Sequence, residues 1–296
     1  MEILNGKHVA TVLKDRIKAT IETNYLSNNK NVPTLACVIV GNNPASQIYV
    51  NNKKKACDYV GFNSNIVRLP QNATYEEVYD VITKLNNDPK TSGILLQLPL
   101  PNGLDEYSLV EHIAPEKDVD GLTTKNLGEM FSAPSKIAPC TATGIIHILK
   151  YYGIEMEGKH AVVVGRSKLV GKSVAVLLEQ NNATVTLCHS KTKNLKEMTK
   201  QADILIVAVG KKHLITGDMV KNGAVVVDAG INRVDNQIYG DIDFDNVAPK
   251  CSYITPVPGG VGPMTIAELL NNTLKLHEKQ NKLQITNTSS KGLLKK

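Results

Sequence analysis

The 296-residue sequence contains no tryptophan, only three phenylalanines and no two cysteines at C-x-x-C spacing. Nucleic-acid-binding surfaces combine clustered Lys and Arg with aromatic side chains that stack on bases, so the shortage of aromatics argues against a nucleic-acid partner. The five cysteines lie far apart and show no Cys/His spacing of a metal site. We therefore expect no metal, and we interpret the cysteines as small buried residues of a protein from a reducing compartment.

The sequence also lacks long apolar runs. Nowhere do eighteen apolar residues follow one another, and the N-terminus has no apolar signal core. We expect a cytoplasmic protein that does not insert into a membrane. The net charge of +6 depends on residues 279–296, which hold five lysines and no acid, and without them the charge falls to +1. The sequence therefore predicts a disordered basic tail at 283–296 rather than a basic binding face.

Apolar runs of strand length alternate with helical patterns along the chain. The runs are 34–41, 65–70, 92–101, 161–166, 184–189, 202–210 and 224–231, and the helical patterns between them include 75–88, 143–153 and 169–182. This alternation predicts an α/β protein with mainly parallel sheets and flanking helices.

Pro and Gly recur between residues 102 and 140, where no long period holds, and we place a domain boundary there. The predicted domains are 1–138 and 139–262. Residues 265–268, TIAE, have the pattern of a capping box that starts a helix. We expect this helix, at 263–282, to return to the first domain.

The segment VVVGRSKLVGKS at 162–173 runs from a predicted strand through a glycine turn into a predicted helix. Such a turn aims backbone N–H groups at phosphate. A P-loop needs four residues between its glycines, whereas five separate Gly165 from Gly171. A dinucleotide fingerprint modified to G-x-S-x-x-x-G, with Ser167 at its third position, fits better. A structural turn that carries an exposed Arg166 remains a third interpretation.

The strand after this loop indicates which dinucleotide would bind. In NAD-binding folds an acid at the end of that strand accepts a hydrogen bond from the ribose 2′-OH. Here the strand ends in CHSK at 188–191, with no acid, and Arg166 lies in the loop. Both features favour NADP. Gly210 and Ile231 follow later strands, where they would line the nicotinamide side or serve only as strand-end packing.

The stretch SQIYVNNKKKAC at 46–57 contains three consecutive lysines. At about 100° per residue, Lys53 falls on the same helix side as Tyr49, whereas Lys54 and Lys55 fall on the opposite side. Those two suit a solvated face. Lys53 lies one turn after Tyr49, beside small and apolar residues, where desolvation would make it a usable acid or base. Snorkelling of its ammonium group to water is the alternative.

Two further polar features interrupt apolar segments. Gln97 stands within GILLQLPLP at 93–101, where a buried amide needs partners, and it could hydrogen-bond to Lys53. A purely structural amide is the alternative. In EKDVDG at 116–121, Asp118 and Asp120 precede a turn glycine. Such acids usually shape turns, but one of them could accept two parallel N–H donors from a flat heterocycle.

Taken together, these motifs resemble those of one known family. Ser46, Tyr49 and Lys53 form S-x-x-Y-x-x-x-K, and this pattern is followed by GILLQLPLP (93–101), KDVDGL (117–122), PCT (139–141), VGRS (164–167) and PVPGGVGPMT (256–265). The order and spacing are similar to those of the bifunctional methylenetetrahydrofolate dehydrogenase/methenyltetrahydrofolate cyclohydrolases. The resemblance covers residues 3 to 280.

The resemblance implies two domains with a cleft between them, the C-terminal one Rossmann-like. It implies NADP-dependent oxidation of 5,10-methylenetetrahydrofolate, followed by hydrolysis of the methenyl product to 10-formyltetrahydrofolate. It also implies a homodimer with tetrahydrofolate derivatives as its small-molecule partners, no metal, and a place in purine biosynthesis. The usual P-C-T-P-x-G reads PCTATG here, so Ala142 replaces a rigid proline, from which we expect looser domain closure but retained activity.

Residue roles follow from the same resemblance. Lys53 is implied as the catalytic acid/base, Tyr49 as the residue that stacks on the folate, Gln97 as the group that tunes Lys53, and Asp120 as the anchor of the pterin edge. The implied folate-contacting loop is Pro258, Gly259, Gly260, Val261 and Gly262. The implied NADP contacts are Thr141, Gly165, Arg166, Ser167, Ser190, Gly210 and Ile231.

Overall fold

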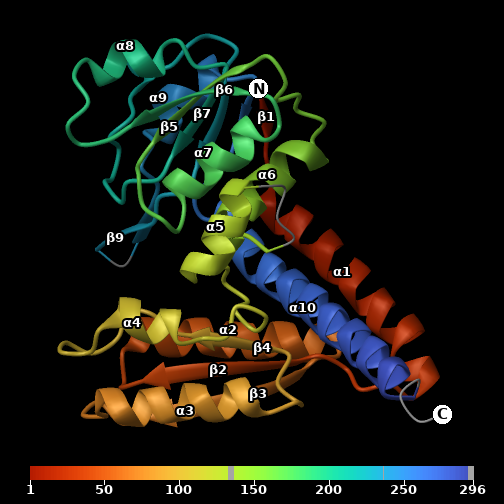
Figure 1. Cartoon of the computed structure of the whole chain (residues 1–296). Coiled ribbons are helices and arrows are strands. Elements are labelled where there is room, and N and C mark those ends of the chain that lie inside the picture. The colour runs from red at the N-terminus through yellow and green to blue at the C-terminus, as the bar shows by residue number, and fades with distance from the viewer. Residues whose placement is uncertain (133–136, 236, 293–296) are drawn as a thin grey trace. The chain divides into compact units, whose positions relative to one another are not determined.

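The computed structural model describes residues 1–132, 137–235 and 237–292, the last ten of them by their backbone alone (Figure 1). The chain forms two compact units. Unit 1 consists mainly of residues 138–268 together with 1–12, and unit 2 consists mainly of 13–129 together with the chain after residue 268. The division therefore falls inside α1 (Gly6–Asn24) and α10 (Val261–Gly292). Residues 1–12 cluster with unit 1 and not with the domain to which the sequence boundaries assigned them.

Unit 2 is built on a three-stranded parallel sheet of order β3-β2-β4, with β2 at Thr34–Val40, β3 at Asn63–Leu69 and β4 at Gly93–Leu96. The crossover helices α2 (Pro44–Val60) and α3 (Tyr75–Asn87) lie on opposite sides of it (Figure 1). Strand β2 is buried on both faces. Its alternate residues Ala36, Val38 and Val40 share a core with Val78, Ile82 and Leu85 of α3.

Local capping fixes where the two helices begin. The Asn43 side chain accepts hydrogen bonds from the backbone N–H groups of Ala45 and Ser46 and so caps α2. Helix α3 begins with a full capping box between Thr74 and Glu77. Because α2 starts directly after β2, the cap places the helix that carries Tyr49 and Lys53 at the carboxyl end of the sheet.

Unit 1 is built on a six-stranded parallel sheet of order β1-β11-β8-β7-β5-β6. The strands are β1 (Glu2–Ile3), β5 (His160–Val164), β6 (Thr184–Cys188), β7 (Ile204–Val207), β8 (Val225–Asp228) and β11 (Tyr253–Ile254). Helices α6 (Cys140–Tyr151), α7 (Gly171–Glu179) and α8 (Leu195–Thr199) accompany them. The strand order reverses at β5, whose neighbours are β6 and β7. Open α/β sheets bind ligands outside the carboxyl ends at such a switch point.

The predicted α/β class with parallel sheets is confirmed, but several boundaries differ. The runs at 92–101 and 202–210 leave the sheet early, after Leu96 and Val207, and continue as loops. Further elements are α4 (Glu106–Glu111), α5 (Thr124–Ser132), α9 (Phe244–Val247), the antiparallel hairpin of β9 (Asn232–Val234) and β10 (Gln237–Tyr239), and 3-10 turns at Leu26–Asn28, Gly217–Met219 and Ala248–Lys250.

The predicted capping box at 265–268 is wrong, because α10 already begins at Val261. Glu268 is fully buried within this helix, and its carboxylate is 2.7 Å from Nδ1 of His147. All five cysteines are buried, as interpreted, and none of them forms a disulfide. Among the described helices, none is both long and apolar enough to cross a bilayer. Of the predicted tail at 283–296, the side chains of 283–292 and the whole of 293–296 lie outside the described residues.

Candidate active site and cofactor edge

Lys53 and Gln97 meet at the carboxyl end of the unit 2 sheet. The Lys53 ammonium group donates a hydrogen bond to Oε1 of Gln97 at 2.9 Å. Gln97 is 9% exposed and follows β4, and its backbone N–H still donates to the carbonyl of Val38 at 2.8 Å. Its Nε2 donates to the carbonyl of Leu98 at 2.7 Å. The amide is therefore held at both ends, and its oxygen faces Lys53.

The three consecutive lysines have three different environments. Lys53 is half-buried, whereas Lys54 is exposed and forms an ion pair with Asp58 at 2.8 Å. Lys55 is exposed as well. Tyr49, one turn before Lys53, leaves 45% of its surface exposed, so its ring is available to a ligand.

Lys117, which sequence reasoning passed over, is a buried cap of α3. Its ammonium group donates to the carbonyls of Leu85, Asn86 and Asp88 at 3.0, 2.7 and 2.7 Å. The side chain is 7% exposed, and burial lowers the pKa of this ammonium group, although the charges of Asp88 and Glu116 oppose that shift. The only signal in the sequence was a lysine beside two acids, and its partners lie about thirty residues upstream.

The two aspartates of the same motif have separate roles. The Asp118 carboxylate is buried and accepts hydrogen bonds from the backbone N–H groups of Gly121 and Thr123 and from the side chain of Asn126. It therefore shapes the turn. Asp120 is half-buried and lines a small cavity next to β4.

The buried thiol of Cys37, on β2, feels the charges of both Lys53 and Asp120. Burial raises the pKa of this thiol to about 11, while the charge of Lys53 lowers it and the charge of Asp120 raises it. Both charges therefore act on the same buried thiol. The structure brings the lysine, the amide and this aspartate to one part of unit 2.

In unit 1 the glycine loop follows β5 at the switch point. Gly165 has φ +124°, and a Cβ there would lie 2.1 Å from the carbonyl oxygen of Ala208. A Cβ on Gly171, the first residue of α7, would lie 2.0 Å from the carbonyl oxygen of Gly165. Both glycines are buried, and backbone packs so closely against backbone here that neither position can carry a side chain. Arg166 and Ser167 are exposed beside them.

The other residues expected at the cofactor lie along the same edge. Ser190, Gly210 and Ile231 follow the carboxyl ends of β6, β7 and β8 and are all exposed. No acid stands at 188–191. Thr141 is the second residue of α6, and its hydroxyl is 3.2 Å from that of Thr265 on α10. A dinucleotide with a charged ribose end therefore fits the residues present.

Residues 258–262, also in unit 1, are packed against the start of α1. The backbone N–H of Lys7 donates to the carbonyl of Gly259 at 2.9 Å, and Gly259 has φ +105°. A Cβ on Gly6 would lie 1.8 Å from the carbonyl oxygen of Gly260. This close approach requires glycine at position 6 and holds the loop where α10 begins.

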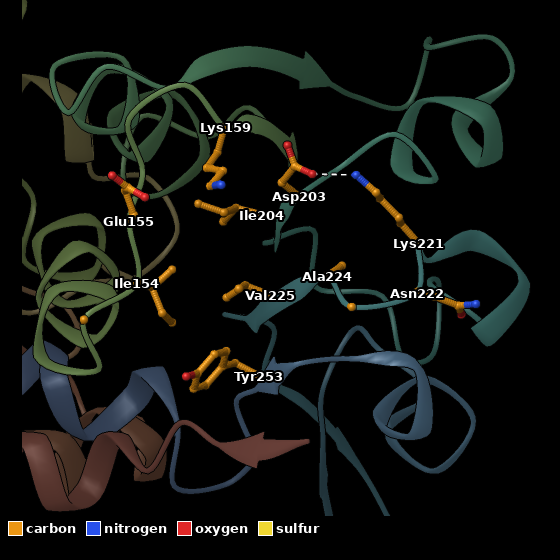
Figure 2. A pocket seen from close by; sticks show the side chains of 12 residues that line it. Ile154, Glu155, Lys159, Asp203, Ile204, Lys221, Asn222, Ala224, Val225 and Tyr253 are labelled. Atoms are coloured by element: carbon orange, nitrogen blue, oxygen red, sulfur yellow. Dashed lines mark hydrogen bonds and ion pairs between the residues drawn. The ribbon is translucent and has the colours of Figure 1, made fainter.

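A cavity of about 480 Å³ opens at the opposite, amino edge of the unit 1 sheet (Figure 2). Figure 2 shows Lys221 and Asp203 joined across one side, at 2.6 Å, with Lys159 and Tyr253 around the opening. It is lined by Gly153, Ile154, Glu155, Lys159, Asp203, Ile204, Lys221, Asn222, Gly223, Ala224, Val225 and Tyr253. These residues precede or begin the strands, so the cavity is separate from the carboxyl edge that carries the glycine loop.

A parallel sheet with a glycine loop at its switch point, together with a lysine–amide pair in a second unit, defines a two-domain enzyme of the dinucleotide-binding class. Residues 139–281 match the family model described as the NAD(P)-binding domain of tetrahydrofolate dehydrogenase/cyclohydrolase, and residues 4–120 match its catalytic domain. The chain belongs to the tetrahydrofolate dehydrogenase/cyclohydrolase family. The glycine loop lies within the part of the chain that matches the NAD(P)-binding domain.

Individual relatives agree with this assignment. The bifunctional protein FolD of Oceanobacillus iheyensis is 50% identical over 274 residues, which are 92% of this chain and 95% of the relative. The crystal structure of the bifunctional enzyme FolD from Campylobacter jejuni is 45% identical with a TM-score of 0.92, over 95% of this chain and 99% of that one.

A more distant solved structure shows a bound cofactor. The methylenetetrahydrofolate dehydrogenase-cyclohydrolase of Trypanosoma brucei, complexed with NADP and an inhibitor, is 35% identical with a TM-score of 0.90, over 94% and 97% of the two chains. The chain described here is therefore an enzyme with a dehydrogenase and a cyclohydrolase activity.

Proposed function

We propose that this enzyme oxidises 5,10-methylenetetrahydrofolate with NADP⁺ and then hydrolyses 5,10-methenyltetrahydrofolate to 10-formyltetrahydrofolate. The observation that carries the proposal is the hydrogen bond between Lys53 and Gln97, in the domain that matches the family's catalytic model. The relatives' names support both activities, and the bound NADP of the Trypanosoma brucei enzyme supports the choice of cofactor.

The dehydrogenase step depends on how the protein positions the cofactor against the folate carbon. When bound, NADP⁺ supplies the acceptor for the hydride that leaves the folate carbon. The backbone at Gly165 and the side chains of Arg166, Ser167 and Ser190 bind its phosphates, and the arginine together with the absent acid favours a 2′-phosphate. Thr141, Gly210 and Ile231 line the remainder of the cofactor.

The cyclohydrolase step depends on a base near the folate. The oxygen of a water molecule forms a bond to the methenyl carbon, and Lys53 in its neutral form takes the proton from this water. The lysine then returns this proton to the leaving ring nitrogen as its bond to carbon breaks, and the remaining hydroxyl proton is lost to solvent as the formyl C=O bond forms. Gln97 accepts one N–H of Lys53 and thereby keeps the amine directed at the same point in both transfers.

The folate is held by the remaining residues. The exposed ring of Tyr49 stacks on it, and the Asp120 carboxylate accepts hydrogen bonds from the pterin edge. The folate is contacted by the segment that leads into the first turn of α10, Pro258, Gly259, Gly260, Val261 and Gly262. None of these roles requires a metal.

The decisive variant is Lys53→Met, with Lys55→Met as a matched control on the exposed side of the same helix. Removal of a general acid/base slows a reaction by about 10²- to 10⁴-fold, so hydrolysis of methenyltetrahydrofolate is expected to slow by that factor in Lys53→Met and to be unchanged in the control. Decay of the methenyl absorbance measures it. Unchanged hydrolysis in Lys53→Met would remove the lysine from this role.

Cofactor choice is tested with the unmodified enzyme. Methylenetetrahydrofolate is supplied with NADP⁺ or NAD⁺, and formation of the reduced cofactor is followed together with the methenyl product. A higher kcat/KM with NADP⁺ is expected. The function itself is contradicted if neither cofactor is reduced.

Assembly and location are also proposed from the family. We expect a cytoplasmic homodimer that supplies 10-formyltetrahydrofolate to purine biosynthesis. Strand β6 ends one side of the unit 1 sheet and leaves Leu187 37% exposed, which gives a second subunit an edge to cover. Sedimentation at micromolar concentration distinguishes a dimer from a monomer, and a monomer at all concentrations contradicts the expectation.

A further inference from the structure

Two buried aspartates lie directly behind the cofactor edge of unit 1. Asp228 ends β8 and is 4% exposed, and Asp241, which follows β10, is 0% exposed. Neither forms an ion pair with a lysine or arginine of the described residues. Both carboxylates are bonded mainly to backbone N–H groups, which marks them as organisers of loops.

Asp241 gathers three successive N–H groups of the loop after β7. Its Oδ2 accepts from the backbone of Val209 at 2.6 Å and of Gly210 at 3.0 Å. Its Oδ1 accepts from the backbone of Lys211 at 2.7 Å and from the side-chain Nδ2 of Asn232 at 2.8 Å. One carboxylate thus fixes residues 209–211 and ties them to the chain that follows Ile231.

Asp228 holds Asp241 itself in place. Its carboxylate accepts from the backbone N–H groups of Gly230, Asp241 and Ile242 at 2.8, 3.1 and 2.9 Å. The packing leaves no spare volume, because a Cβ on Gly230 would lie 2.1 Å from the carboxyl carbon of Asp241. A Cβ on Gly240 would lie 1.9 Å from Oδ2 of Asp228.

Both segments held by Asp241 carry residues of the proposed cofactor site. Gly210 has φ +66° with open space around its Cβ position, and Ile231 is 54% exposed. Strands β7 and β8 are neighbours, and Val207 pairs with Asp228 at their carboxyl ends. The two segments therefore emerge side by side, with an exposed face toward a ligand and a buried face toward Asp241.

We propose that Asp241 is a positioning residue of the dehydrogenase: it sets the shape of the 209–211 loop and of the segment after Ile231, and thereby the affinity for the cofactor. This inference rests on the proposed function, in which Gly210 and Ile231 contact NADP. Because the hydrolysis requires Lys53 and water but no cofactor, Asp241 should affect the rate of the oxidation and not that of the hydrolysis.

The chemistry at this position demands a carboxylate. Four N–H donors point at two oxygens, and an ionised carboxylate consists of acceptors only. In Asp241→Asn one oxygen becomes an NH₂ group, which places donor against donor for two of the four partners. Hydrogen bonds to an ionised group are also about twice as strong as neutral ones. The substitution keeps the volume of the side chain, removes its negative charge and replaces one acceptor oxygen by a donor.

The kinetic experiment compares Asp241→Asn with Asp245→Asn, the same chemical change at an exposed position on α9. We expect the KM for NADP⁺ to rise at least tenfold in Asp241→Asn, with a smaller change in kcat and with methenyltetrahydrofolate hydrolysis within twofold of the unmodified enzyme. Asp245→Asn should leave all three values unchanged. An unchanged KM, or an equal loss of both activities, overturns the inference.

Hydrogen exchange tests the positioning without any turnover. In the cofactor-free enzyme the amides of residues 209–211 should exchange at least tenfold faster in Asp241→Asn, while those of β5 keep their protection. Unaltered exchange at 209–211 overturns the inference even if the enzyme turns over normally. Faster exchange together with no NADP-dependent oxidation by the unmodified enzyme would instead refute the proposed function alone.

A second variant covers the case in which Asp241→Asn does not fold. Asn232→Ala removes the side-chain donor to Oδ1, together with its longer bond to the carbonyl of Tyr239, and leaves the three backbone bonds to Asp241 in place. It should raise the KM for NADP⁺ by about threefold, again without an effect on hydrolysis. A KM within the error of the unmodified enzyme would count against the coupling of the two segments through Asp241.

Discussion

Replacement of Lys117 by methionine tests how strongly a buried ammonium group holds the segment that carries Asp120. The methionine retains the length of the apolar stem and removes the charge. The three carbonyls at the end of α3 then lose their common donor, which lies 2.7 to 3.0 Å from each of them. The backbone of Lys117 also accepts from the N–H of Ile94, so the segment next to β4 is affected as well.

The expected magnitude follows from two opposing contributions. A hydrogen bond to a charged group contributes about 1.5–3 kcal/mol, so three of them contribute roughly 5–9 kcal/mol. Burial of the ammonium group costs several kcal/mol, in line with its lowered pKa. The variant also leaves carbonyls without their partner. We therefore expect the free energy of unfolding to fall by about 3 kcal/mol.

Urea unfolding followed by far-UV circular dichroism measures this loss, with Lys125→Met, an exposed lysine on α5, as the control. The control should change stability by less than about 0.5 kcal/mol. A loss below about 1 kcal/mol in Lys117→Met would refute the reasoning, because it would mean that desolvation of the ammonium group cancels its three hydrogen bonds.

Three further outcomes are expected. Burial raises the pKa of Asp228 to about 6, so the stability that its protonated form contributes is fully present below about pH 4 and is lost as the pH rises through 6. Over this range the free energy of unfolding should fall by about 3 kcal/mol relative to Asp228→Asn. Parallel pH profiles of the two proteins would contradict this expectation. Gly165→Ala, which places a Cβ 2.1 Å from a carbonyl at φ +124°, should weaken NADP⁺ binding at least tenfold in a calorimetric titration and spare the hydrolysis of methenyltetrahydrofolate. Ala142→Pro, in the first turn of α6, should stabilise the protein by about 0.4–1 kcal/mol in thermal unfolding, and a lowered Tm would show that the buried site cannot take the ring.

Local patterns in the sequence were sufficient for the features whose partners lie nearby. The helical spacing of Tyr49 and Lys53 and the amide within an apolar strand predicted a contact that the structure contains. The turn at Asp118 is local as well, since its partners lie three to eight residues away. The alternation of strand and helix patterns predicted the α/β class for the same reason, because each hydrophobic pattern can be read from a few consecutive residues.

Features that depend on distant partners could not be predicted in this way. Asp241 binds N–H groups about thirty residues upstream, and its only sequence signal is an acid between apolar residues. The start of α10 was misplaced because TIAE satisfies a capping pattern, whereas Glu268 is buried against His147, 121 residues away. Propensity and caps are weak compared with such tertiary contacts.

Each unit contains segments from both the early and the late part of the sequence, and this has a consequence for folding during synthesis on the ribosome. Strand β1, made first, pairs with β11 at residues 253–254 to extend the unit 1 sheet. Unit 2 in turn needs His277, whose ring bonds to Ser92 and to the carbonyl of Asn31. Neither unit can therefore finish folding before nearly the whole chain has been released, and a nascent chain halted at residue 138 would hold a sheet without its final helix.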